Sequence, residues 1–206
     1  MRNKYTVTIS RQFGSGGREI GEALAKELGV KFYDKELISL AAKESGISPE
    51  IFESVDEQAT NSLLYSLSLG LYSFGNNFNS TGGLPINDKL YLLQHKIIKQ
   101  VASESPCVIV GRCADYVLKD RDDVINIYIY ADMEHRIQRV RDVKGVNEAK
   151  VEQAIKRTDK SRSNYYNFYS GQKWGLAENY DLCINSTKCT TKQIVELIKS
   201  YLEILS

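Results

Sequence analysis

The sequence predicts an α/β fold in which a five-stranded parallel sheet is covered by helices on both faces. Five short apolar or β-branched runs alternate with segments of helical periodicity, as expected for parallel strands joined by crossover helices. The first run leads directly into a glycine cluster and then a helix, an arrangement that binds phosphate groups in many proteins. The five runs are residues 5–10, 30–33, 107–110, 124–130 and 182–184.

The helices are predicted from the spacing of apolar residues between these runs. After the glycine cluster, Ile20, Leu24 and Leu28 recur at helical spacing, and Gly29 supplies a stop. A helix-like stretch follows the second run, and Ser48 with Pro49 indicates the start of another helix. Further helices are predicted at residues 87–103, at 133–169 with a break near residue 145, and at 190–205.

Length, charge and cysteine content limit the number of domains, the partners and the compartment that we expect. The chain has 206 residues and a formal net charge of +1, so we expect one domain without a general attraction to nucleic acid or to an anionic membrane. Its four cysteines form no CxxC pair, and we expect buried free thiols at Cys107 and Cys183. No leader-like or membrane-spanning apolar stretch is seen in the sequence, and we expect a cytoplasmic protein. The Asn/Ser/Gly-rich residues 75–83 suggest a loop that is disordered or ordered by a ligand.

Charged residues follow four of the predicted strands. In parallel sheets, ligands bind beyond the carboxyl ends of the strands. The candidate positions are residues 11–19, Asp34, residues 111–115 and Asp132.

The glycine cluster is the main candidate for a phosphate site. Gly14, Gly16 and Gly17, with Ser15 among them, lie between a strand and a helix, where backbone N–H groups and the helix dipole favour an anion. The alternative is a tight turn that binds nothing. A dinucleotide fingerprint, G-x-G-x-x-G, is disfavoured because Glu19 stands at the third glycine.

The P-loop pattern G-x-x-x-x-G-K-[ST] is matched imperfectly in two registers. With Gly16 as the second glycine, Arg11 replaces the first glycine and Gly17 replaces the lysine. With Gly17 as the second glycine, Arg18 stands at the lysine and Glu19 at the Ser/Thr. We prefer the second register because it keeps a cation at the lysine position.

Four segments together resemble the cytidylate kinase-like family: ISRQFGSGGREIG, VGR after the third strand, ADMEHR after the fourth, and RSNYYNFYSGQKWG with NYDLCINS near the end. The resemblance implies a P-loop NTPase-type three-layer fold. It places a monophosphate-binding insert at about residues 35–104 and a lid at about residues 145–180. It also implies phosphoryl transfer from ATP, with Mg²⁺, to a nucleoside monophosphate such as CMP or dCMP.

The resemblance also implies roles for individual residues. Arg18 would lie on the β- and γ-phosphates, Arg112 on the acceptor phosphate, and Arg157 and Arg162 over the transferred group. The nucleotide-binding set would be Gly14, Ser15, Gly16, Gly17, Arg18 and Glu19. The acceptor-binding set would be Arg11, Asp34, Lys35, Arg112, Asp115 and Asp132, and no residue is assigned as a metal ligand.

Other residues of the late helices are expected to be structural. Tyr165, Tyr166, Tyr169 and Trp174 are predicted to pack and fix the lid region, and the alternative is that they stack on a base. Arg136 is predicted to lie on a solvated helix face, and the alternative is that it approaches the nucleotide.

The acceptor side departs from the family pattern D-S/T-G-x-x-Y-R. Asp34 is kept, but Lys35, Glu36 and Leu40 stand at the Ser, Gly and Arg positions, so an acceptor other than CMP is also compatible. The missing lysine and hydroxyl of the P-loop leave a second function open, a nucleotide-binding sensor or regulatory module without catalysis.

Overall fold

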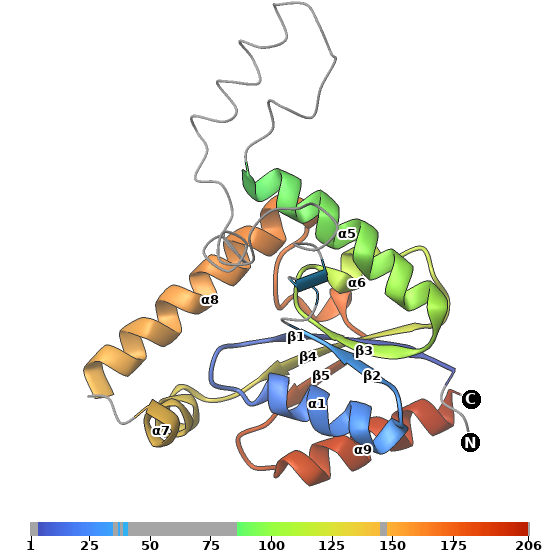
Figure 1. Ribbon diagram of the computed structural model, residues 1–206. Helices are drawn as coiled ribbons and strands as arrows, with labels where there is room; N and C mark the ends of the chain where they lie inside the picture. Colours follow the sequence, from blue (N-terminus) through green and yellow to red (C-terminus); the bar gives the residue numbers. More distant parts are fainter. Residues whose placement is uncertain (1–3, 35–36, 38, 41–85, 145–147, 206) are drawn as a thin grey trace, which may run out of the picture.

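The computed structural model describes residues 4–34, 37, 39–40, 86–144 and 148–205. Within these ranges the chain forms a parallel sheet with helices on both faces (Figure 1). The predicted helix start at Ser48, the loop at 75–83 and most of the predicted insert lie outside the described residues.

All strand pairings in the sheet are parallel, and the order is β2-β3-β1-β4-β5. The strands are β1 (Thr6–Arg11), β2 (Lys31–Tyr33), β3 (Cys107–Val110), β4 (Val124–Tyr130) and β5 (Leu182–Asn185). The five predicted strands are therefore confirmed. Because β3 lies between β1 and β2, the order differs from that of the dinucleotide-binding fold, in which β2 lies beside β1.

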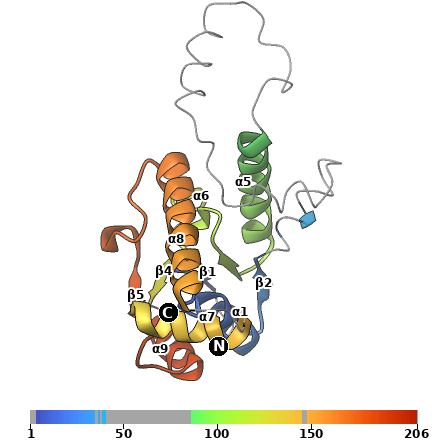
Figure 2. The ribbon, with the colours of Figure 1, turned by 90° about the vertical axis from the view of Figure 1, so that its left-hand side faces the viewer.

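The sheet separates two helical layers (Figure 1). On one face lie α1 (Gly17–Leu28) and α9 (Thr191–Ile204), and on the other lie α5 (Ile86–Glu104) and the short α6 (Ala114–Val117). The helices α7 (Met133–Lys144) and α8 (Glu148–Ser170) extend from one side, as Figure 2 shows from that side. A single 3₁₀ turn, η2 (Ala177–Asn179), precedes β5.

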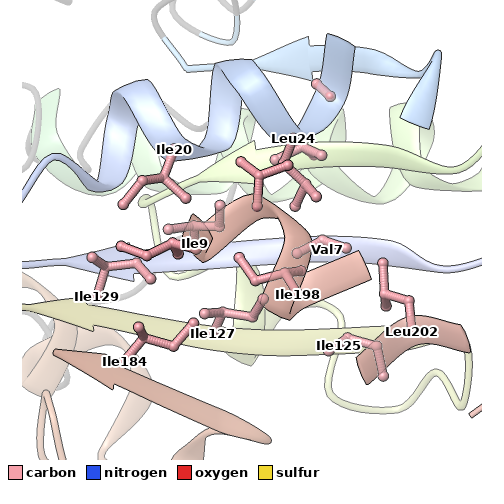
Figure 3. Close-up of a cluster of buried hydrophobic side chains, with 14 of the residues drawn as sticks. Val7, Ile9, Ile20, Leu24, Ile125, Ile127, Ile129, Ile184, Ile198 and Leu202 are labelled. Carbon is pink, nitrogen blue, oxygen red and sulfur yellow. The ribbon is translucent and has the colours of Figure 1, made fainter. Parts of the chain in front are cut away.

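Each face of the sheet has its own apolar core because side chains alternate along a strand. In β3, Val108 and Val110 pack with α1 and α9, whereas Cys107 and Ile109 pack with α5. Figure 3 shows the first of these cores, in which Ile9 and Ile127 of the sheet meet helix residues such as Leu24, Ile198 and Ile20. Fully burying a side chain of this kind contributes about 1.5–3 kcal/mol, so this core holds β1 and α1 against each other.

Two helix ends are set by their capping residues, and the first of these, Gly29, was predicted. Gly29 adopts a left-handed conformation (φ 65°) and its N–H caps the end of α1. Thr190 and Gln193 form a capping box at the start of α9.

The cysteines divide between core and surface. Cys107 is a buried free thiol, as predicted, but Cys183 is exposed, so the prediction of a buried thiol there is wrong. Strand β5 is at the sheet edge, and the alternation that buries Ile184 turns Cys183 to the opposite face. Among the described residues, no helix is long and apolar enough to cross a membrane.

Candidate phosphate-binding site

The loop between β1 and α1 depends on glycine at two positions. Gly14 and Gly16 have φ values of 81° and 82°, a left-handed conformation that costs other residues about 1–2 kcal/mol. A Cβ atom on Gly14 would also lie 3.0 Å from the carbonyl oxygen of Arg136. Gly16 is the N-cap of α1, so the N–H groups of the first helical turn, which have no partner within the helix, lie beside this loop, and that of Gly17 donates to the Ser15 hydroxyl at 3.4 Å.

The loop is held by the carboxyl ends of the neighbouring strands. The Ser15 hydroxyl donates to the carbonyl oxygen of Gln12 at 2.9 Å, and the Ser186 hydroxyl donates to the carbonyl oxygen of Ser15 at 2.7 Å. The side-chain oxygen of Gln12 accepts from the N–H of Ala131 at 3.2 Å. Ser186 follows β5 and was not predicted as a site residue, because only the folded sheet brings it to the loop.

Asp34 joins two arginines from different elements at the end of β2. Its Oδ1 accepts from Nη1 of Arg112 at 2.5 Å, and its Oδ2 accepts from Nε of Arg18 at 2.8 Å. Burial opposes ionisation of this carboxyl, but the charges of Arg112 and Arg11 outweigh it and lower the pKa of Asp34 below its ordinary value. Asp34 is thus a carboxylate that holds a cluster of guanidinium groups.

The segment after β3 directs Arg112 inward at a cost in backbone strain. Gly111, Arg112 and Cys113 have φ values of 76°, 52° and 54° in succession. Left-handed backbone at non-glycine residues persists where the surroundings hold it. Here Arg112 is held by Asp34 and by a hydrogen bond from its Nη1 to the carbonyl oxygen of Val110 at 3.1 Å.

Three arginines line one small pocket, which we call the arginine pocket. Arg11 comes from the end of β1, Arg112 follows β3, and Arg162 comes from α8. Guanidinium groups remain charged at any physiological pH and bind phosphate oxygens in pairs. The charge of its lining therefore suits a phosphate group, but the space that it encloses holds about one water molecule, so side chains must move before a phosphate can enter. Its lining residues are Ser10, Arg11, Gly111, Arg112, Cys113, Arg162, Tyr165, Tyr166 and Trp174.

Helix α8 is attached to the glycine loop by a hydrogen bond and to α7 by an ion pair, both through Asp159. Asp159 accepts from the N–H of Phe13 at 2.7 Å and from Nη1 of Arg136 at 2.5 Å. Arg136 is 6% exposed, so the prediction that it lies on a solvated helix face is wrong. The sequence pattern of α7 could not show that Asp159, on the next helix, would cover it.

Arg162 reaches the same loop from α8. Its Nη1 donates to the carbonyl oxygen of Arg11 at 3.1 Å, and its guanidinium lies 5.7 Å from the centre of the Phe13 ring. This helix thus contacts the loop and the arginine pocket together.

The remaining candidates are spread around this centre. Arg157 is exposed on α8, and Asp132 is exposed after β4, where its N–H donates to the Thr187 hydroxyl at 2.9 Å. Glu19 is exposed, accepts from the Thr191 hydroxyl and pairs with Arg139.

Two further candidates concern the acceptor side. Lys35 lies outside the described residues, so its predicted role stays a prediction. Leu40, at the place of the family's arginine, is an exposed apolar residue.

Asp115 supports the pocket from behind. It accepts from the Tyr166 hydroxyl at 2.7 Å, and burial raises the pKa of its carboxyl to about 6. Tyr165 and Tyr166 are buried in a cluster that includes Trp174, which confirms the predicted packing of these aromatic residues. The pocket wall on the α8 side is therefore a packed aromatic layer.

Comparison with known proteins identifies the family. The sequence model of the cytidylate kinase-like family matches residues 6–188. The chain belongs to this family. The suspected resemblance is thereby confirmed over most of the sequence.

Solved structures confirm the kinase-type fold. An uncharacterized protein from Eubacterium ventriosum is 26% identical, with a TM-score of 0.72 and coverage of 97% of this chain and 98% of its own. Shikimate kinase from Bacteroides thetaiotaomicron (15% identity, TM-score 0.56, coverage 97% and 98%) and a gluconokinase from Sinorhizobium meliloti (14%, 0.56, coverage 100% and 95%) share the fold. No curated protein matches the chain.

The described residues do not fit a protein-held Mg²⁺ ion, although the family resemblance implies that metal. In the two registers, Arg18 or Glu19 replaces the hydroxyl that holds Mg²⁺ in a P-loop. Arg18 is a cation bound to Asp34, and Glu19 is paired with Arg139. Within the described part of the chain, no group of three or more His, Cys, Asp or Glu residues could hold a metal ion.

Proposed function

We propose that this chain is an ATP-dependent phosphotransferase that transfers a phosphoryl group to a nucleoside monophosphate, CMP or dCMP, or to another small acceptor. The observation that carries the proposal is the arginine pocket beside the glycine loop. Phosphoryl transfer requires the donor and acceptor to be aligned and their negative charge to be neutralised. The glycine loop and the three arginines of the pocket are suited to both tasks.

The positions of the residues suggest a division of roles. The N–H groups at the start of α1 would hold the donor phosphates, and Gly14 and Gly16 allow the close approach. Arg112, fixed by Asp34, would bind the acceptor phosphate. Arg162 would neutralise charge on the transferred group from the side of α8, and we propose that residues 145–180 act as the lid.

The acceptor is best identified by turnover. Purified protein is incubated with ATP, Mg²⁺ and one acceptor at a time, and ADP formation is measured. The panel contains CMP, dCMP, UMP and AMP, with shikimate and gluconate included because of the fold neighbours. We expect one acceptor to raise ADP formation well above the rate with ATP alone, and no stimulation by any acceptor would contradict the proposal.

Two variants test whether turnover depends on the arginine pocket. Arg112→Ala should reduce kcat/KM by about tenfold to a hundredfold, because a charge-assisted bond to the acceptor phosphate is lost. Arg121→Ala removes a guanidinium that pairs with Asp123. This pair precedes β4, at the amino-terminal ends of the strands and away from the pocket, so the variant should leave turnover unchanged. Equal effects of the two variants would count against the assigned pocket.

The second candidate is a nucleotide-binding sensor or regulatory module. It is favoured by the absence of the P-loop lysine and hydroxyl in either register. A sensor should bind ATP, seen as a raised unfolding temperature, but form no ADP with any acceptor.

The proposed compartment is the cytoplasm. All four cysteines are free thiols, two buried and two exposed. Exposed free thiols are typical of a reducing compartment, and they support this proposal.

A further inference from the structure

Two unusual residues of the glycine loop are in direct contact. When Gly16 is taken as the second glycine of the P-loop pattern, Arg11 replaces the first glycine and Gly17 replaces the lysine. A Cβ atom on Gly17 would lie 2.5 Å from the Cβ and 3.1 Å from the Cγ of Arg11. The Arg11 side chain therefore begins in the space from which a lysine side chain at position 17 would begin.

The start of α1 supports this register. The helix begins at Gly17, directly after the left-handed Gly16. In a P-loop the lysine follows the last glycine of the loop at the start of the helix. By that criterion position 17, which has no side chain, is the lysine position, and the register preferred from the sequence alone, with Arg18 at the lysine, is replaced by the first register.

Arg18, the other candidate cation, is directed elsewhere. Its Nε bonds Asp34 at 2.8 Å, its Nη1 lies 3.3 Å from Glu22, and its guanidinium lies 5.8 Å from the centre of the Phe32 ring on β2. These contacts draw Arg18 along α1 towards the β2 edge of the sheet. Arg11, in contrast, is buried and lines the arginine pocket with Arg112 and Arg162.

We propose that Arg11 supplies the phosphate-binding cation that the lysine supplies in an ordinary P-loop, and that position 17 is glycine because Arg11 occupies its side-chain space. This inference rests on the proposed function for the identity of the ligand, a nucleoside triphosphate. The guanidinium of Arg11 would donate paired N–H groups to the donor phosphates, where a lysine donates from a single ammonium group.

The proposed replacement of a lysine at position 17 by Arg11 can be reversed by mutation. Four proteins are compared: the parent, Arg11→Gly, Gly17→Lys, and the double variant Arg11→Gly/Gly17→Lys. Binding of ATP and of inorganic tripolyphosphate is measured by calorimetry, and circular dichroism with thermal unfolding checks the fold. Arg121→Ala, at the amino-terminal ends of the strands and away from the glycine loop, is the control for loss of one guanidinium.

We expect Arg11→Gly to weaken both ligands by about tenfold to a hundredfold, since charge-assisted hydrogen bonds are lost. Gly17→Lys alone should lower the unfolding temperature because of the overlap with Arg11. The double variant should bind at least about tenfold more tightly than Arg11→Gly, because the lysine enters the vacated space.

The outcomes separate this inference from the proposed function. Parental binding by a folded Arg11→Gly protein, or no recovery in a folded double variant, overturns the role of Arg11 even if turnover is observed. Binding that depends on Arg11, without turnover of any acceptor, supports this inference and refutes the phosphotransferase. If the parent binds neither ATP nor tripolyphosphate, both proposals are wrong.

Discussion

Replacing Asp34 with alanine should lower the free energy of unfolding by more than the loss of one small side chain would. The carboxylate is the partner of Arg112, whose side chain is only 2% exposed, and also of Arg18, whose side chain is 54% exposed. Asp34→Ala leaves the Arg112 guanidinium buried without this counter-charge, on a backbone segment with positive φ angles. The loss is therefore dominated by one buried cation.

The magnitude follows from the burial of the two pairs. Removing one member of a buried ion pair costs about 3–5 kcal/mol. Arg112 keeps its hydrogen bond to the carbonyl oxygen of Val110, which brings the expected cost to about 3 kcal/mol. The exposed pair with Arg18 adds less than about 1 kcal/mol. For a chain of this length, about 3 kcal/mol lowers the unfolding temperature by roughly 6–12 °C.

Urea unfolding followed by circular dichroism measures this cost. Arg18→Met, which removes only the exposed pair, should cost less than about 1 kcal/mol. Asp34→Ala/Arg112→Met removes both buried charges and should recover about half of the loss or more, because an apolar pair replaces an unpaired cation. A free energy of unfolding for Asp34→Ala within about 0.5 kcal/mol of the parent, or a double variant no more stable than the single, would refute this reasoning.

Three further perturbations test other parts of the site. Because burial raises the pKa of Asp115 to about 6, the folded state binds more protons than the unfolded state between about pH 4 and pH 6, and stability from this group falls as pH rises. Asp115→Asn should therefore gain about 2 kcal/mol relative to the parent by pH 7, and urea unfolding at pH 4 and pH 7 should show it. Gly14→Ala should cost about 1–2 kcal/mol and weaken ATP binding, measured by calorimetry, because of its positive φ and the nearby Arg136 carbonyl. Asp159→Ala should cost about 3 kcal/mol by leaving Arg136 buried and unpaired with this carboxylate, whereas Asp159→Ala/Arg136→Met should recover stability in the same assay.

Much of the fold could be predicted because its signals are local. The β3 strand is a continuous apolar run and β4 is an apolar run interrupted only by Asn126; both have the bounds that the sequence suggests, and Gly29 ends α1 as its position indicates. The strand order could not be predicted from such local signals. β3 pairs with β1 although the two strands are far apart in the sequence, and nothing within either run shows this pairing. Cys183 was mispredicted for the same reason, since an apolar run does not show which strand lies at the edge.

The site was predictable in outline but not in its pairings. Parallel strands bring their carboxyl ends to one edge, so the region of Arg11, Asp34 and Arg112 could be anticipated. Which partner each charge takes depends on long-range geometry. The burial of Arg136 by Asp159 could not be inferred from the alternating charges of the two helices, because those patterns also suit solvated faces.

The close approach of Gly17 to Arg11 should make substitutions at the two positions depend on each other. In this backbone, a side chain at position 17 and a long side chain at position 11 exclude each other. A lineage passing between this loop and an ordinary P-loop therefore avoids the clash only through an intermediate with glycine at both positions, which has lost both cations. Such an intermediate is disfavoured if phosphate binding is under selection, so the two loop types should persist as separate lineages. Sequence searches built on the lysine of the standard pattern would miss members of the second type, whereas the pair Arg11 and Gly17 offers a signature for finding them.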